Sequence, residues 1–279
     1  MSFESFSLIT FFGALAAGLL GALTGLGGGV VIIPLLSLGL GVDLHYAIGA
    51  SLISVIATSS GAAAAYVKEG VSNIRMGMFL EIATTLGAIA GAFLSASLPV
   101  GIIGIIFGFI LIFSAVLSIR KKKDPGSHNE PERPWARRLK LNGQYPTPEG
   151  ITSYRVKHVL GGFLMMSVAG IMSGLLGIGS GALKVLAMDN IMRVPFKVST
   201  TTSNFMIGVT AAASAVVYFQ HGYIKPSIAA PVMLGVLIGA MAGSRVLLKA
   251  QTGWLRWIFA LVVTYLAIQM IYNGYMGNL

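Results

Sequence analysis

Long apolar segments separated by short polar turns make up most of the chain. Most of these segments are 18–23 residues long, enough for a helix rising 1.5 Å per residue to cross a hydrocarbon core of about 30 Å. They lack the period-2 alternation of an outer-membrane barrel. The pattern therefore predicts an all-α polytopic membrane protein with 8–10 transmembrane segments. The ten segments are 5–24, 30–42, 47–67, 76–98, 100–119, 159–176, 182–192, 198–219, 226–248 and 255–274.

Two of the segments are too short to cross a bilayer as straight helices. Segment 30–42 has 13 residues and segment 182–192 has 11, so each reaches only about 16–20 Å. Each follows a glycine-rich run, and paired short segments at matching places in two halves point to the binding site of a transporter. The sequence leaves open whether these segments are broken crossings or re-entrant hairpins.

The chain contains an internal duplication. Residues 18–34 (GLLGALTGLGGGVVIIP) align without a gap with residues 170–186 (GIMSGLLGIGSGALKVL), a shift of 152 positions. The register holds as far as residue 95, and 15 of the 78 aligned pairs are identical. A duplication of this length predicts two structurally similar halves.

Composition supports the membrane interpretation. Of the residues, 55% are hydrophobic and 10% are charged, against about 25% charged in a soluble domain, and the mean hydropathy is +0.82. The net charge of +10 does not indicate nucleic-acid binding, because the single loop between Arg120 and Lys157 carries ten of the 19 Lys and Arg residues and four acids. Only Glu4 precedes the first apolar run, which favours a retained helix over a cleaved signal peptide.

Charge also predicts orientation. With the basic loop in the cytoplasm, both termini lie outside, and the turns expected inside carry six cations where those outside carry only Lys225. Five segments in each half then place the halves in the membrane with opposite orientations, as an inverted-topology repeat. The six inside cations are Lys68, Arg75, Arg193, Lys197, Lys249 and Arg256.

Three regions follow from this division. Residues 1–119 form the first transmembrane repeat, 120–157 a basic cytoplasmic linker, and 158–279 the second repeat. The linker is rich in Pro, Gly and charge and has no apolar periodicity, so we interpret it as a tether that orients the protein; a regulatory or partner-docking role is the alternative.

The glycine-rich runs are the first candidate site. Consecutive glycines allow a ligand to approach the backbone, and before a helix they leave N–H groups free to bind an anion. The other glycines spaced by three or four residues, such as Gly87 and Gly91, are expected to pack helix against helix. The predicted binding positions are Gly25, Gly27, Gly28 and Gly29 in the first half and Gly177, Gly179, Ser180 and Gly181 in the second.

Lys184 is the most unusual residue, because it lies inside an apolar run where its repeat counterpart is Ile32. A buried ammonium usually faces the protein interior and has a function. We expect Lys184 to bind the substrate, with an ion pair to Asp189 or snorkelling to the cytoplasmic face as alternatives. Glu81 and Asp189 are candidates for proton coupling, and for Glu81 a pairing with Arg75 is the alternative.

A hydroxyl-rich stretch opens the segment after the second short helix. Ser51, Thr202, Ser203 and Asn204 are expected to bind an oxyanion, whereas the other hydroxyls are expected to bond back to helical carbonyls. The chain has no cysteine, its four histidines are scattered, and it has no nucleophile–base pair or carboxylate dyad. We therefore expect no enzyme activity, no cofactor and no metal site.

The double motif resembles the TauE/SafE family of sulfite exporters. Each copy continues into a Ser-containing segment and a Tyr-x-x-x-Gly turn (66–70 and 218–222), and the stretch 197–210, KVSTTTSNFMIGVT, is particularly similar to the family. The resemblance implies a bacterial or archaeal inner-membrane carrier of small sulfur-containing anions. The second half departs from the family pattern, with Ser180 in place of a glycine and Leu186 where Pro34 keeps a proline.

The functional hypothesis is a secondary transporter for sulfite, an organosulfonate such as sulfoacetate, or thiosulfate, working by alternating access. The expected partners are the small anionic substrate and the lipid bilayer, not nucleic acid, and a homodimer is the assembly considered. A carrier of small carboxylates or other metabolites, a passive anion channel and a membrane scaffold without transport are the alternatives.

Overall fold

The computed structural model describes residues 3–24, 28–68, 71–119, 134–147, 150–247 and 252–279, and within these ranges the chain is mostly helical. The two apolar halves carry the same element order in the same register. The first half consists of α1 (Phe3–Thr24), α2 (Gly29–Pro34), α3 (Leu44–Lys68), α4 (Ile74–Ser97) and α5 (Val100–Ile119). The second half consists of α7 (Val159–Leu176), α8 (Gly181–Leu186), α9 (Phe196–Gln220), α10 (Pro226–Leu247) and α11 (Thr252–Met276).

The predicted apolar segments are confirmed as helices, with ends shifted by no more than a few residues. The two short helices each continue into one turn of π-helix, η1 (Leu35–Gly39) after α2 and η2 (Ala187–Ile191) after α8. Within the described ranges, α4, α7 and α9 are long and apolar enough to cross a membrane, and shorter apolar stretches lie in the other long helices. The fold is that of a helical membrane protein.

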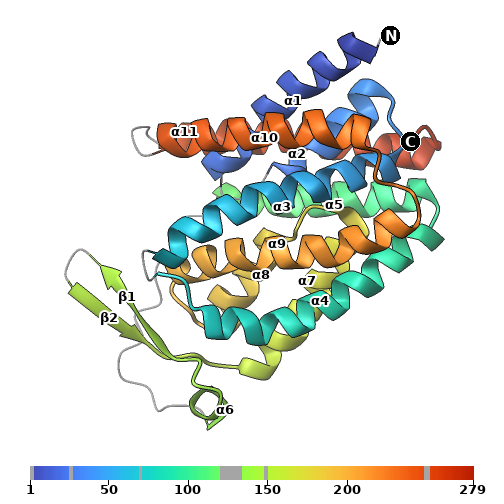
Figure 1. Ribbon diagram of the computed structural model, residues 1–279. Helices are drawn as coiled ribbons and strands as arrows, with labels where there is room; N and C mark the ends of the chain where they lie inside the picture. Colours follow the sequence, from blue (N-terminus) through green and yellow to red (C-terminus); the bar gives the residue numbers. More distant parts are fainter. Residues whose placement is uncertain (1–2, 25–27, 69–70, 120–133, 148–149, 248–251) are drawn as a thin grey trace.

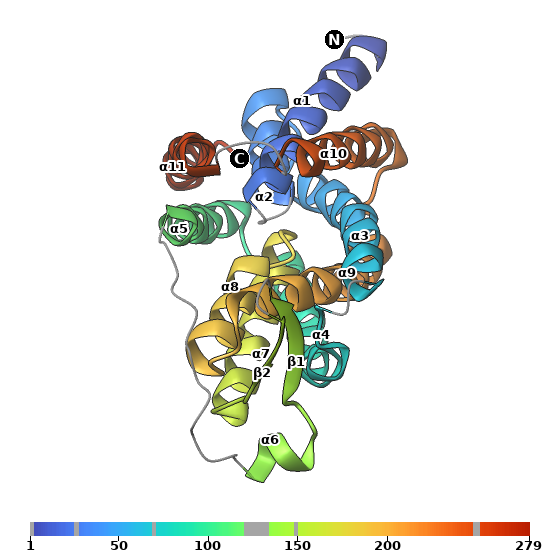
Figure 2. The ribbon, with the colours of Figure 1, turned by 90° about the vertical axis from the view of Figure 1, so that its left-hand side faces the viewer.

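The halves interlock through equivalent contacts. Helix α1 packs along α10, and α7, the counterpart of α1, packs along α4, the counterpart of α10. The remaining long helices pair with their own counterparts, α3 with α9 and α5 with α11. Figure 1 shows both ends of the chain toward the right-hand end of the bundle, and Figure 2 looks along several of the helices.

Glycines bring the paired helices into backbone contact. A Cβ atom added to Gly18 of α1 would lie 2.4 Å from the carbonyl oxygen of Val236, and one added to Gly170 of α7 would lie 2.2 Å from that of Thr84. Positions 18 and 170 are counterparts in the repeat, and so are positions 84 and 236. The expectation that these glycines serve helix packing is confirmed.

The linker contains secondary structure that its composition did not indicate. Its described part contains a short helix, α6 (Pro134–Arg138), and an antiparallel hairpin of β1 (Gly143–Thr147) and β2 (Gly150–Tyr154). Figure 1 shows the hairpin at the end of the bundle opposite the chain termini. Each strand has only five residues, and the strands include Pro146 and two glycines. They are therefore too short to show the alternation of apolar and polar residues by which a strand is predicted from sequence.

The hairpin is held against the helical body by apolar and polar contacts. Tyr145 and Tyr154 are buried in one cluster with Met76 and Leu80 of α4. The Asn73 amide nitrogen donates to the Leu141 carbonyl and to the Tyr154 hydroxyl, both at 2.8 Å. The described part of the linker is therefore folded and packed against α4, and its role in orienting the protein stays a prediction.

Gly91→Ala tests the backbone contact between α4 and α7. The new methyl group would meet the Ile171 carbonyl oxygen at 2.1 Å, so the helices must separate, and we expect a loss of about 1–3 kcal/mol of stability. Gly39→Ala is the matched control, because its nearest neighbour is a Leu35 methyl at 3.8 Å. Thermal unfolding in detergent measures both, and equal melting temperatures would contradict the packing argument.

Candidate functional site

The loop between α7 and α8 has an unusual backbone conformation. Gly177, Gly179 and Ser180 all adopt the left-handed region, with φ of 65°, 71° and 45°. The counterpart of Ser180 is Gly28, which has a right-handed φ of −68°. The two glycine-rich motifs therefore differ in shape as well as in sequence, and a serine occupies the strained position in the second.

This loop leaves a run of backbone N–H groups without acceptors. Among the described residues, no acceptor takes the N–H groups of residues 178–183, and the first helical bond of α8 runs from Lys184 to the Ser180 carbonyl at 3.1 Å. Successive N–H groups in alternating right- and left-handed conformations form a concave anion-binding nest. The second motif therefore has backbone N–H groups that no described group of the protein uses, and the anion site predicted there stays a prediction.

Two serines hold this loop from opposite halves. Ser51 of α3 donates to the Gly177 carbonyl at 2.9 Å, and Ser203 of α9 donates to the Gly181 carbonyl at 3.3 Å. Ser51 also packs on the first motif, because a Cβ at Gly29 would lie 2.6 Å from its hydroxyl oxygen. Since both hydroxyl protons are engaged, these serines position the loop in this conformation.

Ser180 differs from these two serines. It is only 3% exposed, and its hydroxyl has no hydrogen-bond partner. It faces a crevice with a volume of about 10 Å³, which is about the space of one water molecule. A polyatomic anion can enter only if this crevice widens. The crevice is lined by Val30, Ile110, Ser114, Ile178, Ser180, Gly181, Ala182 and Leu183.

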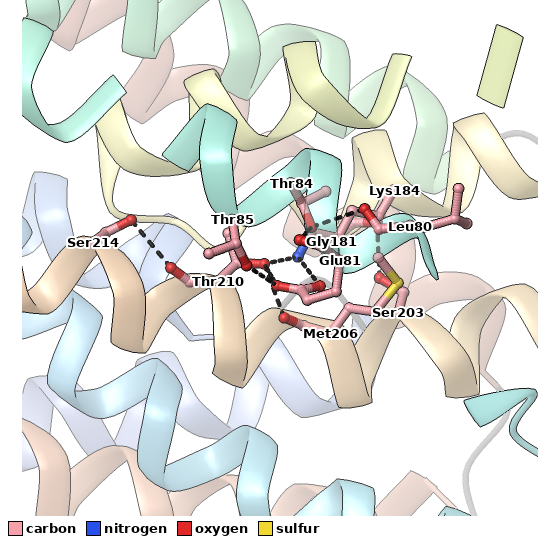
Figure 3. Close-up of polar contacts among 10 residues, drawn as sticks. All are labelled: Leu80, Glu81, Thr84, Thr85, Gly181, Lys184, Ser203, Met206, Thr210 and Ser214. Carbon is pink, nitrogen blue, oxygen red and sulfur yellow. Dashed lines mark hydrogen bonds and ion pairs between the residues drawn. The ribbon is translucent and has the colours of Figure 1, made fainter. Parts of the chain in front are cut away.

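Lys184 is fully buried and belongs to a polar network inside the protein (Figure 3). Its ammonium donates a hydrogen bond to the Thr210 hydroxyl of α9, and it lies 3.9 Å from Oε2 of Glu81 in α4. Glu81 Oε1 accepts hydrogen bonds from Thr210 at 2.6 Å and from Thr85 at 3.1 Å. Glu81 Oε2 has no hydrogen-bond partner, so the carboxyl group keeps one position where a proton can bind.

This network decides between the alternatives left open by the sequence. Lys184 does not snorkel, since it is 0% exposed, and its acidic partner is Glu81 of the other half. Glu81 accordingly pairs inside the protein and not with Arg75. Asp189, the other candidate for proton coupling, is 5% exposed in η2. A buried charge pair of this kind is costly in a membrane, so Lys184 and Glu81 stay the candidates for a functional position.

The other predicted binding residues differ in their positions and contacts. Gly28 and Gly29 lie at the start of α2, while Gly25 and Gly27 fall outside the described residues. The Thr202 hydroxyl accepts a hydrogen bond from the Asn73 backbone at 3.0 Å. Asn204 is half-buried on α9. The other hydroxyls mostly bond back to helical carbonyls, as expected, including those of Ser54, Thr58, Ser59, Ser60, Thr200 and Thr201.

Sequence reasoning missed two features. Ser114 lines the crevice. The sequence could have indicated this residue, because it places a hydroxyl group within the strongly apolar helix α5. His45 and His221, which look scattered along the chain, both stack on the Tyr223 ring, with centroids 4.6 and 6.0 Å away. Only the packing of α3 against the end of α9 brings them together. In the part of the chain that the structure describes, no group of side chains has the composition of a metal site.

A helical membrane body with a polar loop and a buried ion pair inside it has the architecture of a membrane transporter. The chain matches the family Sulfite exporter TauE/SafE over residues 10–270 and therefore belongs to this family. It is a membrane transporter of the TauE/SafE family, which confirms the resemblance seen in the sequence.

The similar proteins are named as probable membrane transporters, without a substrate. The chain is 30% identical over 278 residues to the probable membrane transporter protein YunE of Bacillus subtilis (strain 168), covering 97% of this chain and 98% of the relative. It is 23% identical to the probable membrane transporter protein YdhB of the same strain, covering 85% and 87%. A probable membrane transporter protein of Xylella fastidiosa (strain 9a5c) is 24% identical, covering 99% and 98%. No solved structure matches the chain.

The Lys184–Glu81 pair can be tested by a double-mutant cycle. Lys184→Met leaves a buried carboxyl group without its cation, and Glu81→Gln leaves a buried ammonium without its anion, so each should cost about 3–5 kcal/mol. The double variant removes both charges and should recover most of this loss. Thermal unfolding of the four proteins in detergent measures the coupling, and strictly additive effects would show that the two charges do not interact.

Proposed function

We propose that the protein is a secondary transporter of a small sulfur-containing oxyanion, of the class of sulfite, thiosulfate or an organosulfonate such as sulfoacetate. The main support is the loop 177–181, where free N–H groups and the unpartnered Ser180 hydroxyl converge. The family's name, Sulfite exporter, favours the sulfur-containing class. All these groups are hydrogen-bond donors, and an oxyanion supplies acceptors only.

The substrate lies between the two halves in this proposal. Ser51 reaches the loop from the first half and Ser203 reaches it from the second, so relative movement of the halves would change the loop. The crevice beside Ser180 opens when the halves move apart, and the anion then binds the nest. Val30, which follows Gly28 and Gly29 at the start of α2, lines the same crevice, and in the proposal these glycines and Thr202 and Asn204 of α9 meet the anion once the crevice has widened.

The membrane arrangement is an inverted-topology repeat of two five-segment halves with 8–10 transmembrane segments. Helix α1 contacts α10, and its counterpart α7 contacts α4, the counterpart of α10. Such reciprocal contacts are expected of two halves related by a twofold axis. An axis in the membrane plane gives each half the opposite orientation and lets the halves rock by alternating access. The protein lies in the bacterial or archaeal inner membrane, with residues 120–157 in the cytoplasm and both termini outside.

Proton coupling is assigned to Glu81. Its Oε2 atom has no hydrogen bond and lies beside Lys184, so binding of a proton there would release Lys184 from its partner. Lys184 is three residues from Gly181 on α8, and its freed charge then adds to the attraction of the nest for the anion. Uptake of a proton and uptake of an anion thereby favour one another.

Ser180→Gly separates binding from folding. Glycine adopts the left-handed conformation without the cost of about 1 kcal/mol that serine carries, so the variant should melt at the same or a higher temperature. Loss of a hydrogen bond to a charged ligand should weaken anion affinity about tenfold. The measurement is a thermal-shift titration of purified protein with sulfite, thiosulfate, sulfoacetate, taurine and dicarboxylates.

Ser173→Ala is the matched control, since it also removes a buried hydroxyl without a hydrogen-bond partner, but from α7 outside the loop. Anion affinity should be unchanged in this control. Saturable uptake into liposomes with counterflow separates a carrier from a channel. A stabilising response to dicarboxylates alone would overturn the sulfur-anion assignment, and full affinity in both Ser180→Gly and Lys184→Met would overturn the site.

A further inference from the structure

A second polar cavity lies at the hairpin end of the bundle, away from the loop 177–181. Its volume is about 280 Å³. One wall is the turn that leads into α4, and the other is the linker around the start of β1. The cavity is lined by Val71, Ser72, Asn73, Ile74, Arg75, Lys140, Asn142, Gly143, Gln144 and Tyr154.

The charge of this cavity is positive. Arg75 lines the wall at the start of α4 and Lys140 lines the linker wall, and none of the described lining residues is acidic. Within the described ranges, neither cation forms an ion pair. Both side chains are exposed, so a ligand that reaches the cavity from solution would meet them directly. Two cations facing one space favour an anion there.

Neutral donors surround the same space. The Ser72 hydroxyl oxygen is buried and has no hydrogen-bond partner. The Tyr154 hydroxyl accepts from Asn73 and donates to no described acceptor. Burial raises the pKa of Tyr154 to about 12, so this group keeps its proton at neutral pH and stays a donor. Asn142 and Gln144 add side-chain amides on the linker wall.

Asn73 connects the cavity to the membrane body. Its side chain accepts from the Met76 backbone at 3.0 Å and so caps α4, while it also donates to Leu141 and Tyr154 of the linker. Its backbone N–H donates to Thr202 of α9, next to Ser203, which holds the loop 177–181. A ligand between Arg75 and Lys140 would therefore tighten the contact of the linker with α4 and α9.

We propose that this cavity is a binding site for a small, multiply charged oxyanion that fastens the linker to the ends of α4 and α9. The Arg75 and Lys140 side chains bind the anion from its two sides, and Ser72 and Tyr154 donate hydrogen bonds to it. A volume of about 280 Å³ admits a phosphate-sized group or a small organic dianion, and the two cations select for its charge. This site is separate from the transport loop and does not rest on the proposed substrate.

Calorimetric titration of the full-length protein in detergent tests the proposal, with inorganic phosphate as the probe and chloride at matched ionic strength as the reference. Phosphate should bind saturably, and Arg75→Gln and Lys140→Gln should each weaken it about tenfold, the effect of one hydrogen bond to a charged group. Arg138→Gln is the control, because it removes the same charge from exposed α6 without lining the cavity. Its affinity for phosphate should stay unchanged.

Hydrogen exchange identifies the source of the anion and its effect on the linker. Phosphate should slow exchange in residues 143–154 of the wild type and of Arg138→Gln, but not of Lys140→Gln. If slowing appears without phosphate in nanodiscs containing phosphatidylglycerol, and not in pure phosphatidylcholine, the bound group is a lipid headgroup at the same site. Absence of any response to phosphate or lipid, equal weakening in Arg138→Gln, or loss of phosphate binding in Ser180→Gly would overturn the proposal.

Discussion

Direct backbone contact between helices of different halves is the constraint on which this structure depends. Lipid offers no hydrophobic drive for one helix to leave it and join another, so association relies on close packing and on small residues. Gly18 of α1 allows this approach against α10, and Gly170 of α7 allows it against α4, at positions 152 residues apart. The contact holds the first helix of each half against the fourth helix of the other half, and α3 packs against α9 between these pairs.

The central position of α3 and α9 sets the chemistry of the loop 177–181. Ser51 and Ser203 bond the carbonyls at the two ends of this loop, while its N–H groups stay free. The protein thus satisfies these two carbonyls, whereas the N–H donors of the loop have no described acceptor. In a medium that supplies no water, unsatisfied donors cost several kcal/mol each, so such a loop is retained only where it lines a functional cavity.

The buried pair of Lys184 and Glu81 adds a second link between the halves. At 3.9 Å, the ammonium and the carboxylate attract each other without a direct hydrogen bond, and Thr210 bridges them. A loosely satisfied pair is easier to separate than a bidentate one. This geometry is compatible with the exchange of partners that the proposed proton coupling requires.

The sequence by itself determined the membrane class, the ends of the long helices, the two short helices and the internal repeat, because apolar length and periodicity are local properties that a bilayer enforces. It also singled out Ser180 and Lys184, because each breaks the correspondence between the two copies. Tertiary structure alone decided that Glu81 faces Lys184, that Ser51 and Ser203 hold the loop, and that the linker forms a docked hairpin. These contacts join residues as many as 129 positions apart, and no local pattern records which polar group will meet another across a packed interface.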